Sequence, residues 1–123
     1  MNVLRLCWLG VRAHEHEAMV GVLRDVMGLT PELVEPETTE LSLPSGDRVQ
    51  VFGPGHPYFQ FLGRHASGPV PLFEVDDVQR ARAELVAAGL EVIGEIEDDG
   101  TWEWLHFRGP DGNLYELASR KRA

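Results

Sequence analysis

The densest group of side chains that can bind a metal or move a proton is His14-Glu15-His16-Glu17. Imidazole and carboxylate groups are common ligands of divalent metals. Two ligands on a helix share one face at spacings of three or four, whereas His14 and His16 are two apart. On a turn between a strand and a helix the two histidines could still chelate an ion. We interpret the group as a solvated surface cluster.

Cys7 is the only cysteine, so the chain has no internal disulfide and no thiolate cluster that holds a metal. It lies between Leu6 and Trp8 in an apolar segment, whereas a reactive thiol needs a partly exposed, electropositive setting. We therefore interpret Cys7 as an inert core residue. His56 and His65 lie in a glycine-rich segment and are interpreted as surface or lid residues.

Two tryptophans and a histidine alternate along the predicted strand 101–107, where Trp102, Trp104 and His106 share one face. Leu105 and Phe107 share the opposite face, which suits packing against a helix. The tryptophans and His106 are then left to line a cleft. An alternative stays open, in which the tryptophans only fill space or contact a second subunit.

The segments 45–51 and 111–117 read as copies of one another, with Gln50 at the position of Glu116. Upstream of each copy, an extended apolar segment leads into a helix that ends in Gly-Leu. Glycine after the last helical turn is a common stop signal. The chain is therefore predicted to contain two halves with one plan.

Hydrophobic periodicity predicts the elements of each half. In the first half these are a strand, a helix and three strands, at residues 3–12, 15–27, 31–35, 38–43 and 48–52. The second half repeats this order at residues 70–75, 77–88, 91–94, 101–107 and 113–118. We predict an α+β fold with two tandem βαβββ modules, residues 1–54 and 69–119, in one domain over residues 1–123. The modules form a curved mixed sheet with helices on the outer face and a central cleft.

The segment 53–68 between the modules is rich in glycine and proline, yet it contains the apolar run 58–62. An apolar run of this kind is not left in water. We expect it to pack over a pocket or against a second subunit.

The composition is that of an ordinary globular protein, with 43% apolar and 25% charged residues. A net charge of -9 repels nucleic acid and anionic membranes, so neither is an expected partner. No apolar run is long enough to span a bilayer, and no secretory signal is recognisable. We expect a cytoplasmic protein.

Three segments carry a resemblance to a known family: residues 73–78, residues 87–92 and residues 108–117, the last reading Arg-Gly-Pro-Asp-Gly-Asn-Leu-Tyr-Glu-Leu. Together with the paired plan they resemble the vicinal oxygen chelate superfamily, which contains glyoxalase I, extradiol dioxygenases and the bleomycin resistance proteins. The resemblance covers nearly the whole chain. One departure is Gly109, which stands where an aspartate usually precedes the proline.

In metal-dependent members of that superfamily, the ligands lie on the first and last strands of each half. The resemblance places these positions at Trp8, Gln50, Val70 and Glu116. An indole N–H has no lone pair to offer and a valine has no heteroatom. Since catalytic metal sites need about three protein ligands, we predict that this chain binds no metal and no other cofactor.

The resemblance and the strand parity together predict a ligand-binding site. Its members are Trp8, Gln50, Phe52, Val70, Glu74, Trp102, Trp104, His106 and Glu116. Glu116 is also a possible general base. Aromatic walls with carboxylates favour flat or cationic organic molecules.

We therefore hypothesise a metal-free binding protein, similar to bleomycin resistance proteins, that sequesters a cationic or aromatic compound in an acidic cleft and forms a homodimer. The alternative is a metal-dependent enzyme of the glyoxalase or dioxygenase type with a displaced metal site. A structural or regulatory protein without a small ligand is the third reading.

Overall fold

The computed structural model describes residues 1–122. Its first half consists of β1 (Val3–Arg12), α1 (His16–Gly21), the π-helical turn η1 (Val22–Val26), β2 (Thr30–Glu35), β3 (Thr38–Ser42) and β4 (Arg48–Phe52). Its second half consists of β5 (Val70–Val75), α3 (Val78–Ala87), β6 (Glu91–Asp98), β7 (Trp102–Arg108) and β8 (Leu114–Arg120). Helix α2 (Pro57–His65) joins the halves.

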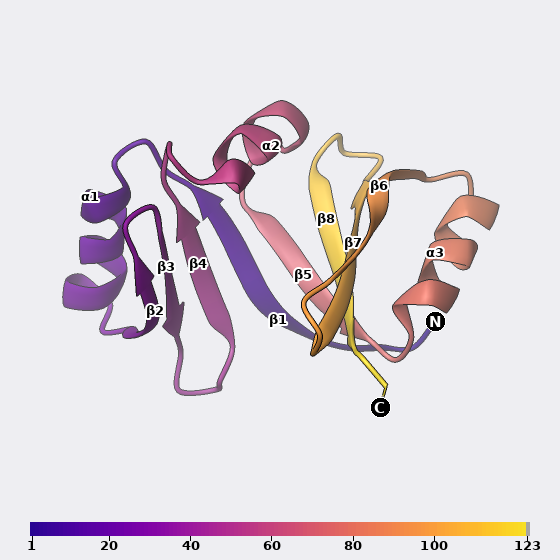
Figure 1. The fold of residues 1–123 in the computed structure, drawn as a ribbon, viewed down its shortest axis with the longest axis horizontal. Helices are drawn as coiled ribbons and strands as arrows, with labels where there is room; N and C mark the ends of the chain where they lie inside the picture. Colours follow the sequence, from indigo (N-terminus) through magenta and orange to yellow (C-terminus); the bar gives the residue numbers. More distant parts are fainter. Residues whose placement is uncertain (123) are drawn as a thin grey trace.

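All strands belong to one eight-stranded sheet in the order β2-β3-β4-β1-β5-β8-β7-β6. The first and last strands of each half, β1 with β4 and β5 with β8, run parallel, and the halves meet where β1 pairs antiparallel with β5. The sheet curves so that its halves face one another, with α1 and α3 on the outer sides (Figure 1). The predicted α+β fold with two βαβββ modules is confirmed.

The second half is organised around α3. Asp77 caps this helix by accepting hydrogen bonds from the backbone N–H groups of Gln79 and Arg80. Apolar side chains recur at helical spacing and pack on the sheet. The resulting core contains Val75, Val78, Ala81, Leu85, Leu105 and Leu117.

The helix predicted at residues 15–27 is shorter and continues into the turn η1. His16 lies on the same face as Val20, one turn later, and both are buried. The His16 ring is 3.3 Å from the Thr39 hydroxyl. The interpretation of residues 14–17 as a solvated cluster is therefore wrong for His16, while His14 is exposed and meets the Phe59 ring edge-on.

The apolar run 58–62 forms part of helix α2, which the glycine and proline content of this segment concealed. The helix has Pro57 in its first turn, and the His56 side chain accepts a hydrogen bond from Tyr58 N at 3.1 Å. Phe59 and Leu62 are buried within the chain itself. Contacts within the chain therefore cover these apolar side chains without a second subunit. The homodimer stays a prediction.

Strands β6 and β8 extend at least two residues beyond their predicted ends, and the extension of β8 brings Arg120 to the central cleft described below. Strand β6 continues past Gly94, which has a φ of 74°, to Asp98. Strand β8 continues to Arg120. Within residues 1–122, no helix combines the length and the hydropathy needed to cross a membrane.

Candidate functional site

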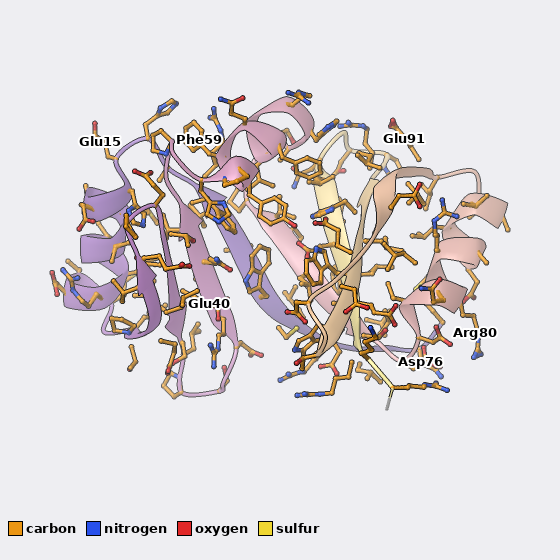
Figure 2. The ribbon with its side chains drawn as sticks, in the orientation of Figure 1. Glu15, Glu40, Phe59, Asp76, Arg80 and Glu91 are labelled. Atoms are coloured by element: carbon orange, nitrogen blue, oxygen red, sulfur yellow. The ribbon has the colours of Figure 1, made fainter. Side chains whose placement is uncertain are left out.

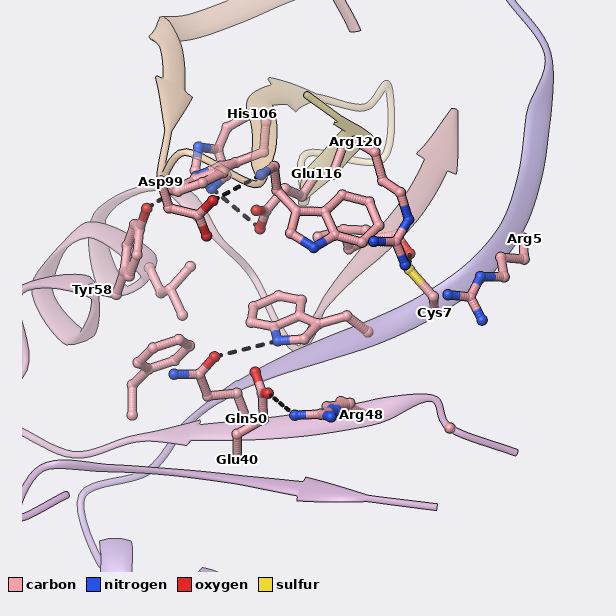
Figure 3. Close-up of a pocket in the computed structure, with 18 of the residues that line it drawn as sticks. Arg5, Cys7, Glu40, Arg48, Gln50, Tyr58, Asp99, His106, Glu116 and Arg120 are labelled. Atoms are coloured by element: carbon pink, nitrogen blue, oxygen red, sulfur yellow. Dashed lines mark hydrogen bonds and ion pairs between the residues drawn. The ribbon is translucent and has the colours of Figure 1, made fainter. Parts of the chain in front are cut away.

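A cleft of about 580 Å³ lies between the two halves of the sheet, and α2 contributes to its lining (Figure 3). This volume is in the usual range for small-molecule sites. The predicted site residues that line it are Trp8, Gln50, Phe52, Trp102, Trp104, His106 and Glu116. The sheet thus brings together side chains that are far apart in the sequence.

The strand register explains how the halves meet. Backbone pairing joins Arg48 to Trp8, Trp8 to Leu72, Leu72 to Glu116 and Glu116 to His106, in one row across five neighbouring strands. Residues paired across adjacent strands point to the same face of a sheet. One row therefore carries an arginine, an indole, a carboxylate and an imidazole into the cleft.

On the first-half side, Trp8 donates a hydrogen bond from its indole Nε1 to Gln50 Oε1 at 3.3 Å. The Gln50 amide in turn donates to the Thr38 hydroxyl at 3.0 Å, which fixes its orientation. The Trp8 ring lies over Gly10, where a methyl group would overlap it. This side of the cleft is aromatic, and Trp8 and Gln50 are both uncharged.

On the second-half side, buried His106 lies between two carboxylates. Its Nε2 is 3.4 Å from Glu116 and its Nδ1 is 3.7 Å from Glu97. Glu97 also accepts a hydrogen bond from the Tyr58 hydroxyl at 3.0 Å, and Trp104 Nε1 donates to that hydroxyl at 3.2 Å. A polar chain therefore links the buried Glu116 to the more exposed Glu97.

Burial changes the acidity of several groups in this cleft, among them Tyr58 and Cys7. It raises the pKa of the Tyr58 phenol well above its usual value, so Tyr58 stays a hydrogen-bond donor at neutral pH. It also raises the pKa of the Cys7 thiol. Cys7 lines the cleft, so its interpretation as a core residue was wrong. An irregularity in the pairing of β1 with β5 brings Cys7 and Trp8 to the same side of the sheet.

Two predicted site residues do not line the cleft. Val70 is completely buried, in a cluster with Phe52, Leu62 and Leu114. Glu74 is bound by Arg5 Nε at 2.8 Å, so that Arg5 reaches the cleft in its place. Strand parity predicted the side of the sheet for both residues but not what would cover them.

The cleft carries less negative charge than the composition led us to expect. Its lining includes Arg5, Arg48 and Arg120 as well as Glu40, Asp99 and Glu116. The expectation of an acidic cleft was wrong because the net charge of -9 describes the whole chain and not this surface.

Strand alternation could have predicted that two of these arginines face the cleft, because Arg48 precedes Gln50 by two residues and Arg120 follows Glu116 by four. Arg120 was not among the predicted site residues because the predicted strand 113–118 ended two residues too early to include it. Arg5 was hidden by the irregular pairing of β1.

The residues at the four superfamily ligand positions do not fit a metal ion. Gln50 Oε1 already accepts the Trp8 N–H, and Val70 offers no donor atom. Glu116 lies 3.4 Å from His106 Nε2. Across residues 1–122, no three His, Cys, Asp or Glu side chains are arranged to hold a metal.

Comparison with known proteins agrees with this architecture. The sequence profile of the Glyoxalase/Bleomycin resistance protein/Dioxygenase superfamily matches residues 5–117. The chain belongs to this superfamily. A search of the curated proteins finds no match.

Solved structures of the superfamily type are similar in fold. A glyoxalase/bleomycin resistance protein/dioxygenase superfamily member from Vibrio splendidus has a TM-score of 0.71 at 20% identity, over 94% of this chain and 98% of that one. Methylmalonyl-CoA epimerase from Mycobacterium tuberculosis has a TM-score of 0.71 at 20% identity, over 98% and 90%.

A variant of the Streptomyces coelicolor methylmalonyl-CoA epimerase in complex with 2-nitronate-propionyl-CoA has a TM-score of 0.70 at 19% identity, over 98% and 100%. At these identities the likeness shows the superfamily fold, and the chemistry of this member has to be argued from its own cleft.

Proposed function

We propose that this superfamily member binds a small aromatic molecule in its central cleft without a divalent metal ion. The observation that carries the proposal is that indoles from both halves, Trp8 from the first and Trp102 and Trp104 from the second, line one cleft of about 580 Å³. Aromatic walls bind flat rings through stacking and burial of apolar area. Of the two ligand properties predicted from the sequence, aromatic character is the one that this geometry favours.

A titration of metal-stripped protein with 2-naphthamide, a neutral aromatic probe, tests the proposal. Tryptophan fluorescence should change saturably, with the same Kd before and after addition of zinc, nickel or manganese. Trp102→Ala should weaken binding about tenfold, or about 1.4 kcal/mol. Tyr115→Leu is the matched control, because Tyr115 stacks on Phe107 and is not among the cleft residues.

Two results would contradict the proposal. One is binding that requires an added metal, or a stoichiometric metal that survives chelation. The other is a Trp102→Ala variant that binds as tightly as the parent protein.

A second candidate function, proton transfer, is favoured by one specific observation. Glu116 and His106 are buried side by side at the cleft, and Glu97 lies on the other edge of the imidazole. A carboxylate that can pass its proton to an imidazole is suited to removing a proton next to a carbonyl group. The neighbouring epimerases agree with such chemistry, although they show only the fold.

The two candidates differ in what Glu116→Gln does. If the protein is only a binder, the substitution leaves no reaction to lose. If it transfers protons, a bound carbonyl compound should exchange its adjacent hydrogen for deuterium, and Glu116→Gln should abolish exchange while binding persists. Exchange that is equal in both proteins would rule out Glu116 as the base.

A further inference from the structure

The two ends of the cleft differ in charge. Arg5 from β1, Arg48 from β4 and Arg120 from β8 lie together on the side away from Tyr58; we call these three residues the arginine end (Figure 3). The other end is lined by uncharged or weakly charged groups of α2 and its cap, namely His56, Tyr58 and Leu62.

The guanidinium groups of the arginine end have hydrogen-bonding capacity to spare. Arg48 contacts Glu40 through Nη1 at 2.7 Å, and no other hydrogen bond occupies its side chain within residues 1–122. Among the same residues, no carboxylate lies within 4.0 Å of Arg120, whose guanidinium instead lies 4.6 Å from the centre of the Trp102 ring. Each guanidinium has five N–H donors, so most of those on Arg48 and Arg120 are open to a ligand.

Arg5 differs, because Glu74 and Asp47 already contact it at 2.8 and 3.5 Å. Its charge is therefore largely balanced within the protein. Arg120, which has no carboxylate partner within residues 1–122, and Arg48, which has the single partner Glu40, are the groups that can take a new anion. The planar guanidinium fork matches the two oxygens of a carboxylate or phosphate, which makes arginine the usual residue for recognising such groups.

The position of the Glu116 carboxylate sets an orientation. Glu116 lies in the same row as Arg48, on the far side of Trp8 and Leu72. An anionic group placed beside Glu116 would be repelled, while the same group beside Arg48 and Arg120 would be attracted. A ring attached to that group would lie between Trp8 and the two tryptophans of β7.

We infer that the ligand of this cleft is an aromatic oxyanion, whose carboxylate or phosphate binds Arg48 and Arg120 while its ring contacts Trp8, Trp102 and Trp104. The inference rests on the proposed function and names its ligand class. It replaces the cationic ligand expected from the net charge, because the local groups and not the whole chain meet the ligand.

Four probes that share the naphthalene ring system but differ in charge test the inference: 2-naphthoate, 2-naphthyl phosphate, neutral 2-naphthamide and cationic 2-naphthylmethylamine. Titration calorimetry at neutral pH and low salt should rank at least one anion about tenfold tighter than the amide, with the cation weakest. The preferred anion identifies the oxyanion. At an ionic strength of about 1 M, where the screening length is about 3 Å, the advantage of the anion should shrink.

The variants separate an anion contact from a structural role. Arg120→Gln should reduce the affinity for the preferred anion to nearly that of the amide, leave amide binding unchanged and weaken the salt dependence. Arg80→Gln is the matched control, since Arg80 is an exposed arginine on α3, away from the cleft (Figure 2). Arg120→Lys keeps the charge without the fork and should bind the anion with intermediate affinity.

Three outcomes would overturn the inference. Equal affinity for the anions and the amide, both reduced by Trp102→Ala, overturns it and leaves the proposed function standing. A loss of amide binding in Arg120→Gln shows that Arg120 acts by supporting Trp102. Binding of none of the four probes overturns the inference and the proposed function together.

Discussion

The two halves of the molecule place equivalent residues, Gln50 and Glu116, in the same cleft but give them different partners. In the first half, Gln50 is a neutral amide that accepts a hydrogen bond from the indole of Trp8. Glu116 lies beside the imidazole of His106, so the second half presents a group that can gain or lose a proton. The shared backbone plan sets where these two side chains point. Their residue types and the partner that a neighbouring strand supplies, Trp8 or His106, set what each can do chemically.

The halves also differ in how firmly their helices begin. Asp77 caps α3 with hydrogen bonds to two backbone N–H groups, whereas no side chain caps α1, which follows Glu15 and passes into the turn η1. A side-chain cap stabilises the first turn of a helix because it accepts hydrogen bonds from backbone N–H groups that have no partner within the helix. The second half is therefore expected to be the more rigid support for the cleft.

The largest effect that would sharpen this comparison is expected at His106. His106→Leu should lower the free energy of unfolding by about 2 kcal/mol, because it leaves the buried Glu116 carboxylate without its partner. Trp8→Phe, which removes only a neutral donor from half-buried Gln50, should cost about 1 kcal/mol or less. Chemical denaturation measures both.

A double variant checks the cause of that loss. Adding Glu116→Gln to His106→Leu should recover part of the stability, because the unpartnered group is then no longer charged. If the double variant is as unstable as the sum of the two single variants, then lost packing and not charge explains the effect.

The helix caps provide a smaller contrast. Asp77→Ala should lower the free energy of unfolding by about 1 kcal/mol, since two N–H groups of α3 lose their acceptor. Glu15→Ala, at the matching position of the first half, should have little effect because the Glu15 side chain makes no capping bond. Equal losses in the two variants would contradict the proposed difference in rigidity.

The smallest expected effect concerns α2, which joins the halves. Burial lowers the pKa of His56, and its neutral ring accepts the Tyr58 N–H. As the pH falls through the ordinary histidine pKa of about 6.5, the unfolded chain binds the proton more readily than the folded chain, so stability should fall with it.

His56→Asn keeps a capping side chain that does not titrate, and it should lose less stability than the parent protein between about pH 7 and about pH 5. This pH range is separate from the range in which Asp98 and Asp111 affect stability, because Lys121 lowers the pKa of Asp98 and Tyr115 lowers the pKa of Asp111. Their stabilising contributions are lost only below the ordinary aspartate pKa of about 4. An unchanged pH dependence in His56→Asn would show that this histidine is not responsible.

Regular strands were the part of the fold that local pattern predicted well. The bounds of β1, β4 and β5 agree with the predicted residues 3–12, 48–52 and 70–75. The alternation of apolar residues also placed Trp102, Trp104 and His106 on the cleft side and Leu105 on the core side. Period-two alternation is a local property, so it is readable without knowing the partners of a strand.

Irregular backbone was where prediction failed. Helix α2 was missed because glycine and proline in its segment outweighed a short apolar face, and its Tyr58 was therefore missing from the predicted site. The irregular pairing of β1 moved Cys7 and Arg5 to the cleft against simple alternation. A single register shift reverses the facing of the side chains beyond it.

The sequence by itself determined the superfamily, the paired modules and the absence of ligand atoms at Trp8 and Val70, because residue type and spacing carry that information along the chain. Only the tertiary structure decided that His106 sits between Glu97 and Glu116, and that Arg48 and Arg120 share one end of the cleft. These residues lie on different strands, and the charge that a ligand meets depends on which strands become neighbours.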